Sequence, residues 1–268
     1  MERYLQRYRY SIILLKQLVK TDFRLRYNDS LLGYVWSLLR PLLLFAILYM
    51  VFAKFLRVGE SIPHYPVYLL LGIVLWNYFG EVTSGSVAAI VGRGDLLRKI
   101  NFPKYVIILA GSFSAFINLL LNFVIIGILM AMTGVSVSWH ILWVVPLLLE
   151  LFTISIALAF LLSALFVRFR DISYIWEVIM QAAFYATPIL YPLSSIPDRA
   201  AKLLILNPIA QIIQDARYAM VSTESLTIRH MFPGRPWIWF LPIIFTAMLA
   251  MITASYFRKR SKYFAEEV

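Results

Sequence analysis

Long apolar runs alternate with short charged segments along this chain. Six of the runs reach the roughly 20 residues that a helix needs to cross a bilayer. They cover residues 32–55, 66–90, 105–132, 140–166, 173–192 and 237–257. The pattern predicts an all-α integral membrane protein, a single domain over residues 1–268 with six transmembrane helices.

The N-terminal segment, residues 1–30, is amphipathic rather than uniformly apolar. Its apolar side chains recur at helical spacing, at Tyr8, Ile12, Leu15, Val19 and Phe23, beside the basic residues Arg9, Lys16, Lys20 and Arg24. A helix of this kind lies along a membrane surface, with its basic side chains near acidic lipid head-groups. We therefore expect an interface helix on the cytoplasmic surface, with Arg9, Lys16 and Lys20 as its binding residues. A solvated helix that packs on a partner protein is the alternative.

The segment between the last two runs, residues 193–236, is apolar but broken by Asn207-Pro208. A proline after a capping residue ends one helix and begins another. The two short helices on either side are too short to span, which favours a re-entrant helical hairpin at the outer leaflet. An ordinary extracellular loop is the alternative. Residues 258–268 form the tail after the last span.

Composition and charge agree with a membrane protein. The chain is 61% hydrophobic and 15% charged, whereas globular proteins have about 25% charged residues. Of the 25 Lys and Arg residues, eighteen lie on the side that carries both termini and seven on the other. Cytoplasmic loops carry such an excess, so both termini are expected in the cytoplasm. The net charge of +11 thus reflects membrane orientation, and no nucleic-acid partner is expected.

Motifs for catalysis are missing from the sequence. It contains no cysteine, no G-x-x-x-x-G-K-[ST] phosphate loop and no G-x-S-x-G turn. The three histidines lack the spacing of a metal site. Glu81, Glu150 and Glu177 fall inside predicted spans, where an ionisable group is costly and becomes a functional candidate. Interhelical hydrogen bonding is the alternative for Glu81 and Glu150, with Asn118 and Asn122 as polar partners.

The fifth predicted span carries a polar stripe. Its members follow one another at spacings of three, four, four and three, which places them on one helical face: Tyr174, Glu177, Gln181, Tyr185 and Pro188. The first span carries an aromatic stripe, Phe45, Tyr49 and Phe52. Hydroxyl and amide groups hydrogen-bond to sugars, and rings pack on the apolar faces of sugars. Both stripes are therefore candidates for a substrate path, and helix packing is the alternative.

Several blocks in a fixed order resemble one transporter family. The blocks are RLRYNDSLLGYVW at 24–36, RPL at 40–42, LRKINFP at 97–103, RFRDI at 168–172, TPILYP at 187–192, NPI at 207–209, and Arg217. Together they resemble the ABC-2-type permeases of polysaccharide exporters. They are most similar to O-antigen exporters, with teichoic-acid and capsule exporters close. Arg40 departs from the family pattern, in which a neutral residue precedes Pro41.

The resemblance implies a specific assembly. Such permeases are homodimers with a translocation path between the two copies, and they lie in the bacterial inner membrane. Each copy docks on a separate ATP-binding subunit, so two copies of that subunit hold the ATP and Mg²⁺. This chain is then not an enzyme and carries no cofactor of its own. The implied substrate is a long glycan on an undecaprenyl-type lipid, exported for lipopolysaccharide biosynthesis.

The cytoplasmic segment 93–104 is the expected contact with the ATP-binding subunit. It surrounds two leucines with charges, as Arg93, Asp95, Leu96, Leu97, Arg98 and Lys99. A short helix of this composition fits an apolar groove with a charged rim. A plain positive-inside anchor is the alternative.

Two other functions remain open at this stage. An ABC-2 permease for drugs or small lipids has the same architecture with another cargo. A membrane enzyme that acts on polyprenyl-linked sugars needs clustered acids in its outer loops, where the sequence has scattered ones: Glu60, Asp198, Asp215 and Glu224. A proton-coupled transporter is disfavoured because no internal repeat is visible.

Overall fold

The computed structural model describes residues 11–22, 33, 35–94 and 102–264. Helices make up most of these ranges, and no strand occurs in them. Residues 11–22 are helical, as the amphipathic pattern predicts. The elements that follow are α2 Val35–Tyr49, η1 Met50–Phe55, η2 Val58–Ser61, α3 Tyr65–Val87, η3 Val91–Arg93, α5 Tyr105–Thr133, η4 Trp139–Trp143, α6 Val144–Arg168, α7 Ile172–Ala186, η5 Leu193–Ser195, α8 Asp198–Leu204, α9 Pro208–Met220, α10 Ile228–Met231, α11 Pro236–Trp239 and α12 Leu241–Arg260.

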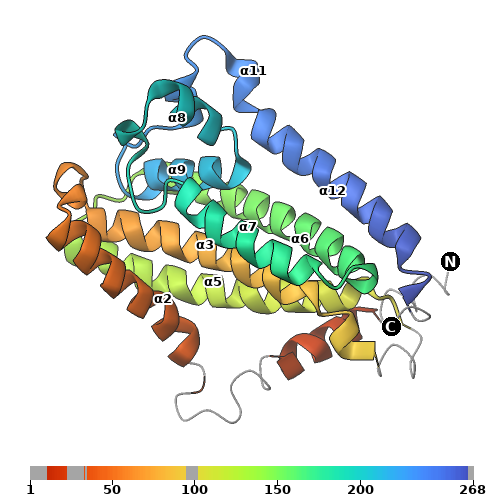
Figure 1. Ribbon diagram of the computed structural model, residues 1–268. Coiled ribbons are helices and arrows are strands. Elements are labelled where there is room, and N and C mark those ends of the chain that lie inside the picture. Colours follow the sequence, from red (N-terminus) through yellow and green to blue (C-terminus); the bar gives the residue numbers. More distant parts are fainter. Residues whose placement is uncertain (1–10, 23–32, 34, 95–101, 265–268) are drawn as a thin grey trace.

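Helix α3 is the centre of the bundle (Figure 1). It begins with Pro66 in its first turn, where a missing N–H costs nothing. Seventeen of its 23 residues are buried, because α2, α5, α6, α7 and α9 all contact it. A helix that is apolar on every side is stable only in such a position.

Five helical segments are long and apolar enough to cross a membrane. They are Val35–Phe55, Tyr65–Val87, Tyr105–Thr133, Trp139–Arg168 and Leu241–Arg260, close to five of the six predicted spans. The predicted fifth span, 173–192, is a helix only as far as Ala186. Proline disfavours the helical conformation in the residue before it, and Thr187, before Pro188, is extended at ψ 137°. Because α7 has only 15 residues, the count of six spans is not confirmed.

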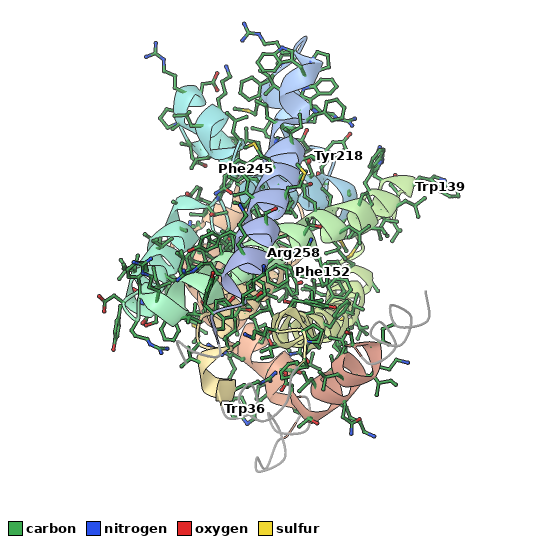
Figure 2. All side chains as sticks on the ribbon, turned by 90° about the vertical axis from the view of Figure 1, so that its right-hand side faces the viewer. Trp36, Trp139, Phe152, Tyr218, Phe245 and Arg258 are labelled. Atoms are coloured by element: carbon green, nitrogen blue, oxygen red, sulfur yellow. The ribbon has the colours of Figure 1, made fainter. Side chains whose placement is uncertain are left out.

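The bundle has two chemically different ends. Residues 11–22, the end of α3, the start of α5 and the end of α12 gather at one of them, which we call the basic end (Figure 1). Lys16, Lys20, Arg93 and Arg258 lie there. Helix α9 and the start of α3 lie at the opposite end, the α9 end. Trp139 is 87% exposed and projects from the side of the bundle (Figure 2). Its short helix η4 contacts α9, and an exposed indole is typical of a membrane–water interface.

Residues 193–236 form short helices at the α9 end. Two of them, α8 and α9, flank the predicted break at Asn207-Pro208. The Asn207 side chain accepts a hydrogen bond from the Ile209 N–H at 3.0 Å and so caps α9. Helix α9 packs against α3, α6 and α12 and is almost entirely buried. The prediction of two short helices around this break is confirmed, and the re-entrant hairpin is not.

Arg217 connects α9 to the rest of the α9 end. Its guanidinium is fully buried and donates to the carbonyls of Tyr68 at 3.2 Å, Pro188 at 2.6 Å and Ile189 at 2.7 Å. The Cζ atom also lies 3.4 Å from the ring centroid of Tyr68. A methyl group at Gly72 would lie 2.6 Å from Arg217 Nη2, so glycine is required at this close approach. One side chain therefore joins α9, α3 and the turn after α7.

We expect Arg217→Met to destabilise the protein by about 3 kcal/mol, because three carbonyls would lose their donor inside the bundle. Thermal unfolding of the purified protein in detergent measures the change. Arg199 is exposed, so Arg199→Met is the matched control and should leave the melting temperature unchanged. Equal melting temperatures for both variants would contradict the role of Arg217.

Candidate functional site

Helix α7 presents an open polar face. Tyr174 and Tyr185 are 72% and 69% exposed, and Glu177 and Gln181 between them are also exposed. None of the fifteen described residues of α7 is buried. The predicted stripe therefore exists as an exposed helical face, except that Pro188 lies beyond the end of the helix. Hydroxyl, amide and carboxylate groups on an exposed helical face are costly in a membrane unless they meet water or a polar ligand.

Aromatic packing holds the opposite side of α7 on α3. Trp76 contacts Phe184 with ring centroids 6.0 Å apart, and Phe79 contacts Trp176 at 6.3 Å. Edge-to-face rings of this kind fix both the position and the rotation of a helix. The polar face of α7 is consequently directed away from the bundle.

The α7 face is linked to the α9 end by Tyr191, which sequence reasoning did not select. Its hydroxyl donates to the Tyr185 carbonyl at 2.9 Å. Its own carbonyl accepts a hydrogen bond from the Tyr68 hydroxyl at 3.4 Å. The TPILYP block that contains Tyr191 was the available signal, but the block alone does not reveal a contact with residue 68.

The aromatic residues of the first predicted span lie in a different environment. Phe45, Tyr49 and Phe52 are half-buried and pack against the core. Phe45 stacks on Tyr49 at 5.7 Å, and Tyr49 stacks on Tyr65 of α3 at 6.4 Å. The exposed large side chains of α2 are instead mainly aliphatic, including Leu43 and Ile47. This arrangement favours the helix-packing alternative for the first-span stripe.

Glu81 forms an interhelical hydrogen bond. This bonding was predicted as the alternative to a functional role. Asn118 Nδ2 donates to Glu81 Oε1 at 3.2 Å, and Asn122 Nδ2 donates to the Asn118 carbonyl at 2.8 Å. The first of these hydrogen bonds joins α3 to α5, and the second lies within α5. Glu150 differs, because its buried Oε1 has no hydrogen-bond partner in the described part of the chain.

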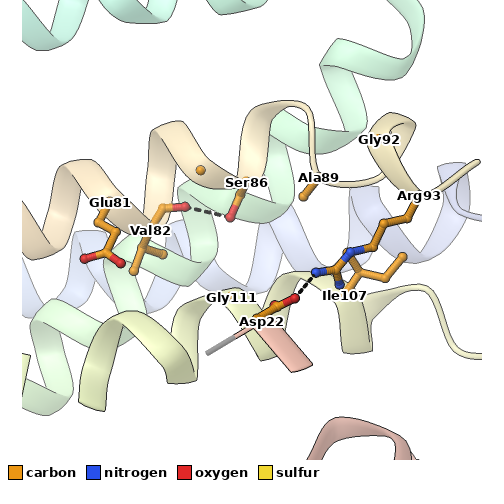
Figure 3. A pocket seen from close by; sticks show the side chains of 10 residues that line it. Asp22, Glu81, Val82, Ser86, Ala89, Gly92, Arg93, Ile107 and Gly111 are labelled. Atoms are coloured by element: carbon orange, nitrogen blue, oxygen red, sulfur yellow. Dashed lines mark hydrogen bonds and ion pairs between the residues drawn. The ribbon is translucent and has the colours of Figure 1, made fainter. Parts of the chain in front are cut away.

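A polar cavity of about 400 Å³ opens at the basic end (Figure 3). Its lining includes Glu81, Ser86, Asp22 and Arg93. Arg93 Nη2 donates to Asp22 Oδ1 at 2.5 Å. This ion pair ties the helix at 11–22 to the segment that follows α3. Asp22 was not selected from the sequence. The only indication of its role in the sequence is that it is an acidic residue at the end of a basic helix.

The remaining predicted site residues are only partly covered by the structure. Lys16 and Lys20 are exposed on the helix at 11–22. The others lie outside the described residues: Arg9, Asp95, Leu96, Leu97, Arg98 and Lys99. Arg93 is thus the one predicted coupling residue whose surroundings are described.

Titratable side chains also gather around α9. Burial raises the pKa of the Asp215 carboxyl to about 6, although Gln211 Nε2 donates to it at 2.6 Å. His140 and His230 flank the Tyr218 ring, with centroids 5.5 Å and 5.7 Å away. Among the described residues, no group of three or more His, Cys, Asp or Glu side chains could hold a metal ion.

These features define a class of protein: a helical multi-pass membrane protein with a polar face on one helix. Comparison with known proteins identifies the family. Residues 13–221 match the ABC-2 type transporter family, and the chain belongs to that family.

Several relatives are permeases or transport proteins. The chain is 32% identical to the O-antigen export system permease protein RfbA of Myxococcus xanthus over 95% of both chains. It is 30% identical to the protein of that name from Klebsiella pneumoniae, over 76% of this chain and 78% of the other. The polysialic acid transport protein KpsM of Escherichia coli is 21% identical, over 75% and 78% of the two chains. The resemblance stated from the ordered blocks is confirmed.

We expect loss of the Asp22–Arg93 ion pair to release the helix at 11–22. The pair is partly buried, at 16% and 27% side-chain exposure, and worth about 1 kcal/mol, or about a five-fold change in local opening. Asp22→Asn and Arg93→Met should each speed tryptic cleavage after Lys16 and Lys20 by about that factor, measured by mass spectrometry.

The double variant should be cleaved no faster than either single one, because both substitutions remove the same contact. Asp198→Asn is the control, since it removes an acid from the exposed Asp198–Lys202 pair and should change nothing. If the double variant is instead cleaved faster by the product of the two single factors, the two side chains act separately.

Proposed function

We propose that this chain is the membrane-embedded subunit of an ATP-driven exporter for lipid-linked polysaccharide of the O-antigen type. The observation that carries the proposal is the exposed polar face of α7 in an otherwise apolar bundle. Similarity to O-antigen export permeases along almost the whole chain supports the choice of cargo. The transported substrate is then a glycan on an undecaprenyl-type lipid, moved from the cytoplasm to the outer face of the membrane.

The proposed topology has six spans and both termini in the cytoplasm of a bacterial inner membrane. The excess of Lys and Arg at the basic end supports its cytoplasmic location. Helix α7 with residues 187–192 would be the fifth span, shortened by Pro188. The segment 193–236 at the α9 end would be re-entrant in the outer leaflet, where short helices can bury their polar groups in protein.

A second copy of the chain is the proposed partner in the membrane. Pro41 is the only buried residue described in α2, and α7 has none. These two helices pack on α3 with one side and leave the other side available to another protein. A path between two copies would place both α7 faces around the glycan.

A separate ATP-binding subunit, in two copies, is the proposed source of energy and would hold ATP and Mg²⁺. The phosphate loop that this chain lacks would belong to that subunit. Its docking surface would include Arg93 and the segment 95–99, with Lys16 and Lys20 beside it or on acidic lipid. The Asp22–Arg93 ion pair supports this arrangement, because it joins the two parts of the surface.

The chemistry of the α7 face suits a moving polymer. Gln181 and Glu177 can exchange hydrogen bonds with successive hydroxyls, and the Tyr174 and Tyr185 rings can pack on sugar faces. Exposed groups of this kind bind each sugar unit of the glycan weakly, so no single unit stays bound and stops the polymer. Processive movement requires that property.

We expect Gln181→Leu combined with Tyr185→Leu to lower glycan export at least about ten-fold, because two sugar-binding groups become apolar. Surface labelling of the glycan in cells that lack the native gene measures export. The neighbouring exposed residues Ile175 and Ile179 provide the control variant, Ile175→Leu with Ile179→Leu, which should export normally. Normal export by the first variant, at equal protein levels, would place the path elsewhere.

A further inference from the structure

A second cavity, of about 250 Å³, lies at the α9 end. Segments that are distant in the sequence form its wall: the loop before α3, the turn around Pro192, helix α9 and the loop after α9. Its polar lining residues are Tyr68, Ser194, Gln214, Ser222, Glu224 and Ser225. Its volume is slightly below that of pockets for drug-sized ligands, about 300–1,000 Å³, and suits a single ring.

Gln214 is the residue that indicates a ligand. Its side chain is 1% exposed, and its Nε2 has no hydrogen-bond partner in the described ranges. Buried amide donors without a partner are rare because they lose their hydration without compensation. Gln214 lines the cavity, so a turn of its amide group brings this donor to an acceptor oxygen of a ligand there.

The rest of the wall combines hydroxyl groups with apolar surface. Ser194, Ser222 and Ser225 supply hydroxyls, and Ile62, Pro63, Pro192 and Leu226 supply apolar contacts. The loop after α9 is ordered by its own hydrogen bonds. The Glu224 N–H donates to Ser222 Oγ at 3.2 Å, and the Ser225 N–H donates to the Ser222 carbonyl at 3.1 Å. A wall that combines hydroxyls with apolar contacts matches the two kinds of surface on a sugar ring.

Charge restricts the kind of sugar. Glu224 contributes a carboxylate to the wall, and no Lys, Arg or His is among the described residues that line the cavity. Arg217 is close in sequence, but its guanidinium is buried against three carbonyls and the Tyr68 ring. An acidic sugar would therefore meet repulsion without a compensating cation, whereas a neutral sugar would not.

We propose that this cavity binds one neutral sugar unit of the glycan as it leaves the α7 face. The proposal rests on the proposed export function and deepens it by naming the class of sugar. The chain of contacts from Tyr185 through Tyr191 to Tyr68 leads from the end of the α7 face to the cavity wall. Gln214 and Ser222 are the binding residues, and Glu224 excludes acidic units.

Saturation-transfer NMR on the full-length chain in lipid nanodiscs tests the proposal. The probes are the methyl glycosides of mannose, glucose, galactose, rhamnose and N-acetylglucosamine, with N-acetylneuraminic acid as the acidic sugar. At least one neutral glycoside should receive saturation from the protein, and the acidic sugar should receive none. Gln214→Leu should weaken binding about ten-fold, the effect of one lost hydrogen bond.

Ser222→Ala is a second variant on a less buried residue, so the test does not depend on the folding of Gln214→Leu. Its matched control is Ser195→Ala, which removes an exposed hydroxyl outside the cavity lining and should bind normally. Glu224→Gln should admit the acidic sugar. The proposal is overturned if no neutral glycoside binds, if Ser222→Ala and Ser195→Ala bind equally, or if the acidic sugar binds the unaltered chain as well.

The two levels of the proposal fail separately. If the α7 variant loses export but no glycoside binds, the cavity assignment is wrong and the export function stands. If a glycoside binds through Gln214 and Ser222 but cells without the chain still export the glycan, the export function is wrong.

Discussion

The buried guanidinium of Arg217 is the contact on which the α9 end depends. A cation without water is costly unless its donors are all directed at acceptors, and here three backbone carbonyls and one aromatic ring surround it. Those carbonyls belong to α3 and to the turn after α7. The same contact therefore holds the turn after α7, α9 and α3 together at the α9 end, where the second cavity lies.

The lipid bilayer offers no hydrogen bonds, which explains how the polar side chains of the long helices are paired. Most polar side chains of the long helices return their hydrogen bonds to their own backbone, as Thr83, Ser86 and Ser112 do. Glu81 instead uses Asn118 of the neighbouring helix. Helix α7 is the exception, because Glu177 and Gln181 lie open on its surface. The proposed path for the glycan rests on this exposed polar face.

The sequence predicts the long helices well, because apolar runs in a bilayer have few alternatives to helix. It also predicts the break at Asn207-Pro208 from local chemistry. The predicted fifth span extends to residue 192 because apolar residues continue past Pro188. The helix itself ends at Ala186. Local sequence patterns do not predict contacts between residues that are distant in the chain. Asp22 and Arg93 are 71 positions apart, and Arg217 and Tyr68 are 149 positions apart. The ion pair is such a contact, and the second cavity is formed by segments that are equally distant in the sequence.

Photocross-linking from α7 to the glycan tests the central claim most directly. A benzophenone side chain at position 185, activated in cells during export, should attach glycan and give a ladder of heavier bands that a glycan-specific antibody detects. The same group at Ile244, which is 56% exposed on α12, should attach no glycan. Cross-links from position 185 to lipid or protein alone would contradict a glycan path along α7.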